Sequence, residues 1–517
     1  MKEFVRKVGG VNFQTIRTAF MCGVIGIVGS AAAAEEAYQA LLLMQHRGQD
    51  SAGILTNDSY DNSIHMHRGS GLVDQVFDAQ KLNQLRGQIA IGHTRYSTIG
   101  NIKEGDIQPS TINFPFGISL AHNGNVVNVD EIRDYLKDNR KRFIFSNNDS
   151  EVMINLIADE LVAQGFEKFC FEHLKIAIKS LFEKTKGAYS VIGSLSGKGF
   201  FAFRDPRGIR PLVMGKKRYN TNEQAPERES FCFSSESNTI NYLEYEFLRD
   251  LDPGELVYID QEGNFFNAIL DTQEMKNCMF EWIYFANPES TFSGKNVYSA
   301  RIGLGKLIAK NVMEAIEKKE VEVDVIVPIP ESSRVSAIAL SEESGIPYRE
   351  LLIKNRYIQR SFILNSQKSR EKAVRRKLSP VKEEIFGKHV LLVDDSIVRG
   401  TTSKHIIDMI RKCGAKSVSI ASTCPPILHP CFYGIDFPYE KDLIAFGKSL
   451  KEIRLAIQAD RIFYLQYEQL FEALESKKIC TACLDGDYPV SISGASNFLK
   501  NRDKGNLKFE ANSNENA

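Results

Sequence analysis

The stretch that decides the fold is Val390-Leu-Leu-Val-Asp-Asp-Ser-Ile-Val-Arg-Gly-Thr-Thr-Ser403. Its first four residues are apolar, which predicts a buried strand of a parallel sheet. Asp394 and Asp395 end that strand, hydroxyls, a glycine and an arginine follow, and a helical pattern begins at Ser403. Such a turn favours phosphate, because free backbone N–H groups and the helix dipole attract an anion. The two carboxylates suit ribose hydroxyls or Mg²⁺.

Two Asp residues after an apolar run are common, but the full stretch is specific. It resembles the phosphoribosyl pyrophosphate signature of type I phosphoribosyltransferases. Its particular residues resemble the form of that signature in the glutamine-dependent amidophosphoribosyltransferases of purine synthesis. The substrate-binding residues that this resemblance implies are Asp394, Asp395, Ser396, Arg399, Gly400, Thr401, Thr402 and, from a basic segment further upstream, Lys354. The implied magnesium ligands are Ser332, Asp394 and Asp395. Ser332 follows a second predicted strand, residues 324–330, where a helix cap is the simpler explanation.

The composition excludes several classes of protein. At 517 residues the chain is too long for one ordinary core, so two large domains are expected. Its 65 basic and 65 acidic residues balance, which gives no reason to expect nucleic acid or an anionic membrane as a partner. No apolar run approaches the ~18 residues of a membrane span. Nine cysteines are too sparse for a disulfide scaffold, so a reducing, cytoplasmic setting is expected.

The beginning of the chain indicates a cysteine nucleophile. Residues 1–21 have no continuous apolar core, which argues against a secretory signal. They are either a short propeptide or the result of a start site that belongs at Met21, and both leave Cys22 first in the mature chain. Residues 22–29 form an apolar, glycine-containing pattern that predicts a strand, and a cysteine in a strand of this kind is usually a core residue. An N-terminal cysteine, however, offers its thiol as nucleophile and its α-amino group, with a pKa of about 8, as base.

Three polar motifs follow Cys22 in order, around Arg95, around His122-Asn123-Gly124 and around Asp149. Each alone is explained by a strand end, an Asn-Gly turn or a helix cap. Together they resemble the N-terminal-nucleophile glutamine amidotransferases, in which Cys22 would be catalytic. The resemblance assigns Arg95 to the glutamine α-carboxylate and Asp149 to its α-ammonium group. Asn123 and the Gly124 N–H would form the oxyanion hole, and His122 would be structural.

The resemblance implies an α/β fold with two domains. Residues 22–262 are expected to form an α/β/β/α glutaminase domain, so that this half has α+β character. Residues 263–490 are expected to form a type I phosphoribosyltransferase domain around a parallel sheet. The polar composition of residues 491–517 predicts a disordered tail. A basic run at residues 368–377 resembles the loop that closes over the substrate.

Four cysteines have a context that suggests a metal centre: Cys278, Cys431, Cys480 and Cys483. The last two form a C-x-x-C pair, which alone fits zinc, a redox pair or no chemistry. With the other two they resemble the 4Fe-4S ligands of the iron–sulfur branch of the family. Four thiolates also satisfy zinc, so the resemblance alone names the metal. Because a cluster would join Cys278 to the distant pair Cys480 and Cys483, a structural or oxygen-sensing role is expected.

The resemblance implies that the first domain hydrolyses glutamine through a Cys22 thioester. The ammonia would then displace pyrophosphate from magnesium-bound phosphoribosyl pyrophosphate, giving 5-phosphoribosylamine for purine synthesis. Inhibition by purine nucleotides and a homotetramer are implied in the same way. Two alternatives share one half of the chain each. A sugar-phosphate amidotransferase would lack residues 390–403, and a regulator that only binds phosphoribosyl pyrophosphate would have no use for Arg95 and Asp149.

Overall fold

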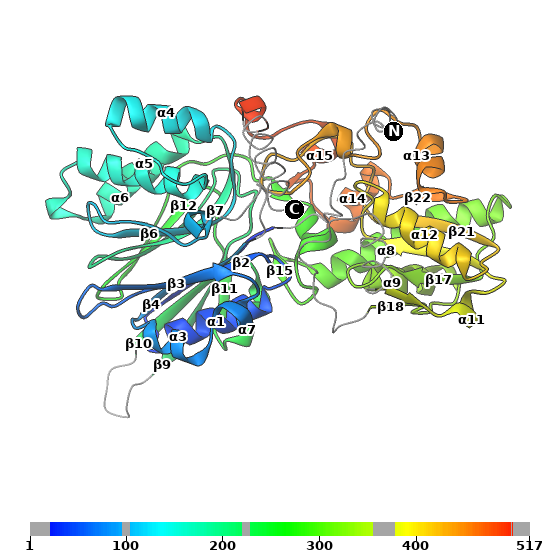
Figure 1. Ribbon diagram of the computed structural model, residues 1–517, viewed down its shortest axis with the longest axis horizontal. Coiled ribbons are helices and arrows are strands. Elements are labelled where there is room, and N and C mark those ends of the chain that lie inside the picture. Colours follow the sequence, from blue (N-terminus) through cyan, green and yellow to red (C-terminus); the bar gives the residue numbers. More distant parts are fainter. Residues whose placement is uncertain (1–20, 96–103, 220–227, 355–377, 498, 500–517) are drawn as a thin grey trace, which may run out of the picture.

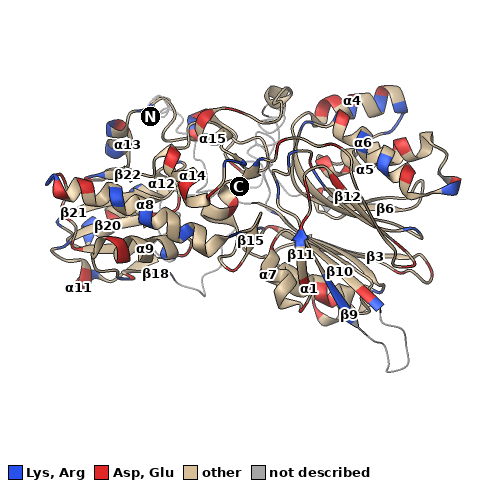
Figure 2. Ribbon diagram, turned by 180° about the vertical axis from the view of Figure 1, so that it is seen from behind, with Lys and Arg blue, Asp and Glu red and all other residues tan. Residues whose placement is uncertain are grey.

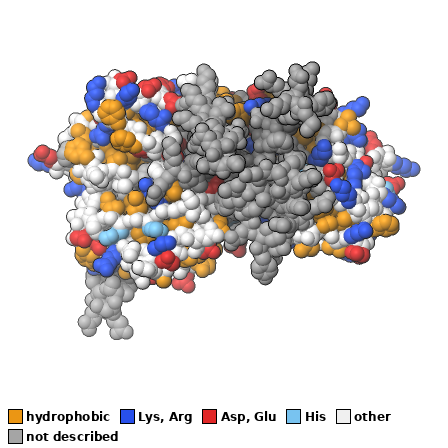
Figure 3. All heavy atoms as spheres, viewed as in Figure 1, with side chains coloured by type: hydrophobic (Ala, Val, Ile, Leu, Met, Phe, Trp, Pro, Cys, Tyr) orange, Lys and Arg blue, Asp and Glu red, His pale blue; other side chains and the backbone are white. Residues whose placement is uncertain are grey.

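The structure is a computed structural model that describes residues 21–95, 104–219, 228–354, 378–497 and 499. Figure 1 shows two bodies side by side, the first running from blue to green and the second from green to red. Charged residues of both signs are spread over both bodies (Figure 2), and the face in Figure 3 shows the same mixture. In the described part of the chain, no helix has the length and the apolar character needed to cross a membrane.

The first body is built on two antiparallel sheets that pack face to face. The seven-stranded sheet has the order β11-β9-β10-β1-β4-β2-β3, and the six-stranded sheet has the order β13-β12-β8-β7-β6-β5. The strands of the first sheet are β1 (Gly23–Val28), β2 (Ser51–Asn57), β3 (Ile64–Ser70), β4 (Ile89–Arg95), β9 (Val213–Tyr219), β10 (Arg228–Ser234) and β11 (Glu246–Asp250). The strands of the second are β5 (Ser110–Ile112), β6 (Ile118–Val126), β7 (Gly187–Leu195), β8 (Gly199–Arg204), β12 (Glu255–Asp260) and β13 (Phe265–Ile269).

Helices cover the outer face of each sheet. The seven-stranded sheet carries α1 (Ala33–Leu43), α2 (Val73–Val76), α3 (Ala79–Gln84) and α7 (Ser237–Tyr242). The six-stranded sheet carries α4 (Val129–Arg140), α5 (Asp149–Ala163) and α6 (Phe171–Lys184). Between the sheets lies an apolar layer that includes Val24, Ile91, Ile192 and Phe200. This confirms the expected α/β/β/α layers. Because β13 pairs with β12, the sheet continues past residue 262, where the sequence placed the domain boundary.

The second body contains a four-stranded parallel sheet of order β17-β20-β21-β22. Its strands are β17 (Val325–Pro328), β20 (His389–Asp394), β21 (Ser417–Ser422) and β22 (Ile462–Tyr464). Alternate side chains of β20 enter two different cores. Leu391 and Val393 join the cluster that contains α8 (Val297–Glu317) and α9 (Arg334–Ser344). Val390 and Leu392 join the cluster of α12 (Thr401–Lys412) and α13 (Leu450–Ile457). The predicted buried strand is confirmed, and the helix begins at Thr401, two residues earlier than predicted.

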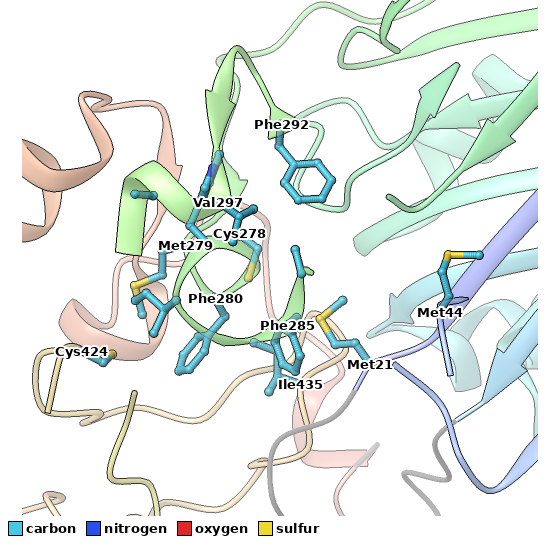
Figure 4. Packing of buried hydrophobic residues seen from close by; sticks show 14 of the residues in the cluster. Met21, Met44, Cys278, Met279, Phe280, Phe285, Phe292, Val297, Cys424 and Ile435 are labelled. Carbon is cyan, nitrogen blue, oxygen red and sulfur yellow. The ribbon is translucent and has the colours of Figure 1, made fainter. Parts of the chain in front are cut away.

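The remaining elements of this half are short, and besides a 3-10 helix at Glu440–Asp442 there are ten among the described residues. They are β14 (Asn277–Cys278), a π-helical turn (Glu281–Phe285), β15 (Thr291–Phe292), β16 (Lys295–Asn296), β18 (Leu352–Lys354), β19 (Leu378–Pro380), α11 (Lys382–Ile385), α14 (Tyr467–Leu474), β23 (Ile479–Cys480) and α15 (Ala482–Asp485). The two bodies share one apolar cluster, in which Met21 lies near Phe285 and Ile435 (Figure 4). The predicted closing loop at residues 368–377, residues 1–20 and most of the predicted tail lie outside the described residues.

Candidate active sites

Cys22 lies directly before β1, at an edge of the first body. The strand is fixed on one side by Ser235, whose Oγ accepts from the Val24 N–H at 3.0 Å and whose N–H donates to the Val24 carbonyl at 3.1 Å. On the other side it pairs with β4, with Gly23 opposite Thr94. A Cβ atom on Gly23 would lie 2.9 Å from the Thr94 Oγ1, so glycine lets the chain enter the sheet here. The Cys22 thiol is free of disulfide bonds and half-buried.

Arg95 ends β4, and Asp149 begins α5. The Arg95 Nη1 donates to the carbonyl of Asp106, which also accepts from the Asn148 side chain at 2.8 Å. The Asp149 carboxylate accepts from the Val126 N–H at 3.0 Å and lies 2.8 Å from the His122 Nε2. Burial raises the pKa of Asp149, but His122 and the backbone donor outweigh it and hold the pKa below its usual range. Asp149 is therefore a half-buried carboxylate that remains ionised.

The Asn123–Gly124 pair of β6 has two features suited to an oxyanion. The Asn123 side chain is buried, and within the described residues its Nδ2 has no hydrogen-bond partner. A buried donor without a partner is costly unless a ligand accepts from it. Gly124 has a φ of 145°, and a Cβ atom there would lie 1.9 Å from the Ala188 carbonyl oxygen. Only glycine fits this position, so its N–H can be presented in a conformation that other residues avoid.

The carboxylate pair of the second site lies at the carboxyl end of β20, as predicted. Both Asp394 and Asp395 are buried, and the Asp394 Oδ1 accepts from the Asp395 N–H at 3.0 Å. Ser396 Oγ donates to the Asp395 Oδ1 at 2.7 Å, and Ser332 Oγ donates to the other oxygen. Burial and the neighbouring carboxylate raise the pKa of Asp394 well above its usual range. Burial also raises the pKa of Asp395, although Ser332 opposes this effect.

The loop after the carboxylate pair turns into the N-terminus of α12. Gly400 has a φ of 72° at the N-cap, and a Cβ atom there would lie 2.1 Å from the Ile444 Cδ1. The helix that begins at Thr401 directs its first N–H groups toward the loop. Arg399 Nη2 lies 3.5 Å from the Asp442 Oδ2. Lys354 is exposed at the end of β18.

The four cysteines of the predicted metal centre come together from three segments. The parallel pairing of β14 with β23 sets Cys278 beside Cys480, and the N–H groups of Leu428 and His429 donate to the Cys483 carbonyl at 2.9 and 3.0 Å. Burial raises the pKa of Cys278 to about 11, and Cys431 adds to that rise. All four thiols are free. In the described ranges, no set of three or more His, Cys, Asp or Glu side chains is arranged to hold a metal ion.

Several residues around the glutamine-type site were not predicted. Asp106 links Arg95 to the Asn147–Asn148 turn, because its carboxylate accepts from the Asn147 N–H at 2.9 Å. His93 lies fully buried beside these groups, and among the described residues neither ring nitrogen has a hydrogen-bond partner. His93 stands two residues before Arg95 in the first polar motif, which is the only sign of it in the sequence. Nothing in the sequence around Asp106 marks it.

Comparisons with known proteins cover both bodies. A glutamine amidotransferase domain model matches residues 93–242, and a phosphoribosyl transferase domain model matches residues 296–429. The chain is 42% identical to an amidophosphoribosyltransferase of Escherichia coli over 95% of both chains. It is also 42% identical to an amidophosphoribosyltransferase of Methanocaldococcus jannaschii, over 92% of this chain and 98% of the relative.

The fold agrees with a solved structure as well. A glutamine phosphoribosylpyrophosphate amidotransferase from B. subtilis, complexed with ADP and GMP, superposes with a TM-score of 0.79 at 37% identity. The match covers 91% of this chain and 98% of that one. These relatives span nearly the whole chain, including both candidate sites. The chain therefore belongs to the amidophosphoribosyltransferase family.

Proposed function

We propose that the chain converts glutamine, water and phosphoribosyl pyrophosphate into glutamate, 5-phosphoribosylamine and pyrophosphate, the first committed step of purine synthesis. The observation that carries the proposal is the presence of two complementary sites in one chain. One has a buried amide donor, Asn123, that has no partner among the described residues and lies on β6, which contacts the strand that follows Cys22. The other has a buried carboxylate pair before a helix N-terminus. Relatives that cover both halves favour this function over a regulator or a sugar-phosphate amidotransferase.

At the first site, Cys22 attacks the side-chain amide carbon of glutamine. The thiol proton passes to the α-amino group, and that amine can be free only when residues 1–21 are absent. A thioester forms and ammonia leaves with the transferred proton, after which water hydrolyses the thioester to glutamate. In both steps a negative charge develops on the former amide oxygen. The Asn123 Nδ2 and the Gly124 N–H stabilise it, and they do so strongly because the site is buried.

Arg95 and Asp149 orient the substrate in this proposal. Arg95 offers a planar fork for the α-carboxylate of glutamine, and its Nη1 is already aimed by the Asp106 carbonyl. Asp149 stays ionised and can accept from the α-ammonium group. Its contact with His122 Nε2 fixes the carboxylate in place, so His122 acts as a support and not as a base.

At the second site, the loop from Asp394 to Thr402 binds phosphoribosyl pyrophosphate. The N–H groups at the start of α12 and the hydroxyls of Thr401 and Thr402 suit the 5-phosphate, and Ser396, Arg399, Gly400 and Lys354 complete the proposed contacts. Asp394 and Asp395 would accept from ribose hydroxyls and, with Ser332, would hold magnesium. The donor set suits such an ion, because two adjacent buried carboxylates have raised pKa values and neither forms an ion pair among the described residues. When bound, the ion neutralises charge on the departing pyrophosphate.

The four thiols supply the donor types of the proposed 4Fe-4S cluster, with Cys278, Cys480 and Cys483 buried and Cys431 half-buried. They are free, three separate segments bring them together, and Arg210 is close enough to oppose the rise in the pKa of Cys278 and Cys431. Cys278, Cys431, Cys480 and Cys483 would hold the cluster, which would fasten the C-terminal segment to the start of the second body. We further propose a cytoplasmic homotetramer that purine nucleotides inhibit. The ADP and GMP bound to the B. subtilis relative support that regulation.

The deciding experiment measures pyrophosphate release from phosphoribosyl pyrophosphate with either glutamine or ammonia as the nitrogen source. The parent protein should use both once its first residue, determined by mass spectrometry, is Cys22. Cys22→Ala should lose the glutamine reaction and keep the ammonia reaction, whereas Cys170→Ala, at an exposed cysteine, should keep both. Asp394→Ala should impair both reactions. Normal use of glutamine by Cys22→Ala would show that the nucleophile is assigned wrongly.

A further inference from the structure

Arg47 is a buried arginine that joins the two bodies. It lies between α1 and β2, and its Nε donates to the Oε1 of Glu236, a residue of the first body. Its Nη2 donates to the Glu281 Oε2 at 2.6 Å, and its Nη1 lies 3.5 Å from the Oε1. Glu281 opens the π-helical turn of the second body. The side chain of Arg47 is fully buried and that of Glu281 is 3% exposed, so this forked ion pair lies out of water.

The stem of Arg47 passes the residues that hold the glutamine-type site. A Cβ atom on Gly23, the residue after Cys22, would lie 3.5 Å from the Arg47 Cδ. The next residue, Gly48, lies against β4, since a Cβ atom there would be 2.6 Å from the Arg95 backbone nitrogen. Asp50 then donates its N–H to the Arg95 carbonyl at 3.0 Å. A displacement of Arg47 therefore reaches both the nucleophile strand and the strand that ends in Arg95.

The turn that carries Glu281 is held from the other side by Arg301 of α8. Arg301 donates to the carbonyls of Trp282 at 2.9 Å, Tyr284 at 3.0 Å and Ala286 at 2.9 Å. The Arg301 carbonyl accepts from the Ser336 Oγ at 2.9 Å, and Ser336 belongs to α9, the helix that follows the Ser332 loop of the second site. The turn thus has one side fastened beside the second site and the other side paired with Arg47. Single π-helical turns often occur at functional sites.

We propose that Arg47 and Glu281 form a positioning pair that aligns Cys22 and Arg95 for glutamine from the second body of the chain. This inference rests on the proposed function. Neither side chain serves as a catalytic residue, and the pair acts by fixing two strand ends whose relative position sets the geometry of attack. The pair is strong because the planar Arg47 guanidinium faces both Glu281 carboxylate oxygens in a buried setting, where water does not compete for these hydrogen bonds. Glu236 fixes the other edge of Arg47 and also accepts from the Asn287 N–H at 2.9 Å and the Ser290 Oγ at 3.1 Å, both in the second body.

The test is Glu281→Gln, which keeps the shape of the side chain and removes its charge. We expect kcat/KM for glutamine to fall about 10- to 100-fold while kcat/KM for ammonia changes less than about twofold. Arg47→Lys keeps the charge but not the planar guanidinium, so its kcat/KM for glutamine should lie between that of the parent and that of Glu281→Gln. The matched control is Glu255→Gln, since Glu255 is equally buried and binds Arg249 through two 2.6 Å contacts in another part of the first body. The control should keep the ratio of the two activities even if its thermal midpoint drops.

A second readout is the rate at which a diazoketone analogue of glutamine alkylates Cys22. It should slow in Glu281→Gln in the same proportion as glutamine use, because it requires the same alignment and no chemistry at the second site. The inference is overturned if Glu281→Gln loses glutamine and ammonia activity equally, or if Glu255→Gln shifts the ratio as much. The glutamine and ammonia activities of the parent protein test the proposed function. The change in the ratio of these activities from parent to variant tests the positioning pair, so one proposal can fail while the other holds.

Discussion

Gly124→Ala tests the oxyanion site with a single methyl group. The new Cβ atom would lie 1.9 Å from the Ala188 oxygen and 2.7 Å from the Tyr189 Cα, whereas real Cβ contacts essentially never fall below 3.0 Å. Both close neighbours are backbone atoms of β7, which is paired with β6 on both sides of the contact. The residue must therefore move by about 1 Å. In addition, a φ of 145° is strained for alanine and costs about 1–3 kcal/mol.

A movement of this size removes the Gly124 N–H from hydrogen-bonding range of the oxyanion. Loss of one oxyanion donor costs about 10²- to 10³-fold in kcat, or about 2.7–4 kcal/mol of transition-state stabilisation. We expect glutamine hydrolysis to fall by that factor with little change in KM, because the contacts of Arg95 and Asp149 with the substrate are retained. The ammonia reaction at the second site should remain.

The assay compares the glutamine and ammonia reactions and the thermal midpoint of each variant. Gly165→Ala is the matched control, because Gly165 has a φ of 80° and its added Cβ atom would meet nothing within 4 Å. It should lose about 1–2 kcal/mol of stability and no activity. Unchanged glutamine turnover in a folded Gly124→Ala protein would refute the oxyanion role. An equal loss of the ammonia reaction would show that the damage is not local.

Three further outcomes are expected. Burial, with smaller contributions from His122 and Arg95, holds the pKa of His93 well below its usual value, so unfolding takes up a proton below pH ~6.5. The free energy of unfolding should then fall by up to about 1.4 kcal/mol for each pH unit below pH ~6.5. Denaturant titrations should show that this free energy depends less on pH in His93→Gln. Ser332→Ala, which removes a donor to Asp395, should raise the Mg²⁺ concentration needed for half-maximal ammonia activity. Cys431→Ser should lose bound iron and sulfide after anaerobic purification, whereas Cys413→Ser should keep both.

The sequence predicted the local structure around the second site well because its elements are consecutive in the chain. Strand, carboxylate pair, loop and helix are consecutive, so the order of residue types gives the arrangement, and β20 and α12 lie within two residues of their predicted ends. Asp394 itself is the last strand residue, which follows from its ladder pairing with Ser422. The stacked sheets of the first body were accessible only through the resemblance, since the alternation of apolar residues does not state which sheet a strand joins.

Contacts between residues far apart in the chain could not be predicted from the sequence. Arg47 stands in a polar loop, and nothing near it indicates that its partners are Glu236 and Glu281, which lie 189 and 234 residues away. The hydrogen bond from Arg95 to Asp106 and the His93 ring, which has no hydrogen-bond partner in the described part of the chain, likewise depend on how three segments pack. The expected domain boundary at residue 262 stays a prediction, and the hairpin of β12 and β13 continues the sheet past that residue.

Two of the four clustered cysteines stand next to the contacts through which the second body reaches the glutamine-type site. Cys278 lies three residues before Glu281, the partner of Arg47. Cys431 directly precedes Phe432, whose carbonyl accepts from the Asn125 side chain at 2.8 Å, and a Cβ atom on Gly434 would lie 3.3 Å from the Gly124 backbone. Both segments are short, and in each the cysteine lies within three residues of the supporting contact, so what the thiols bind bears on the position of that contact. If a cluster binds there, its loss should reduce glutamine use before ammonia use, because the oxyanion strand and the nucleophile strand lose their supports while the parallel sheet of the second site does not.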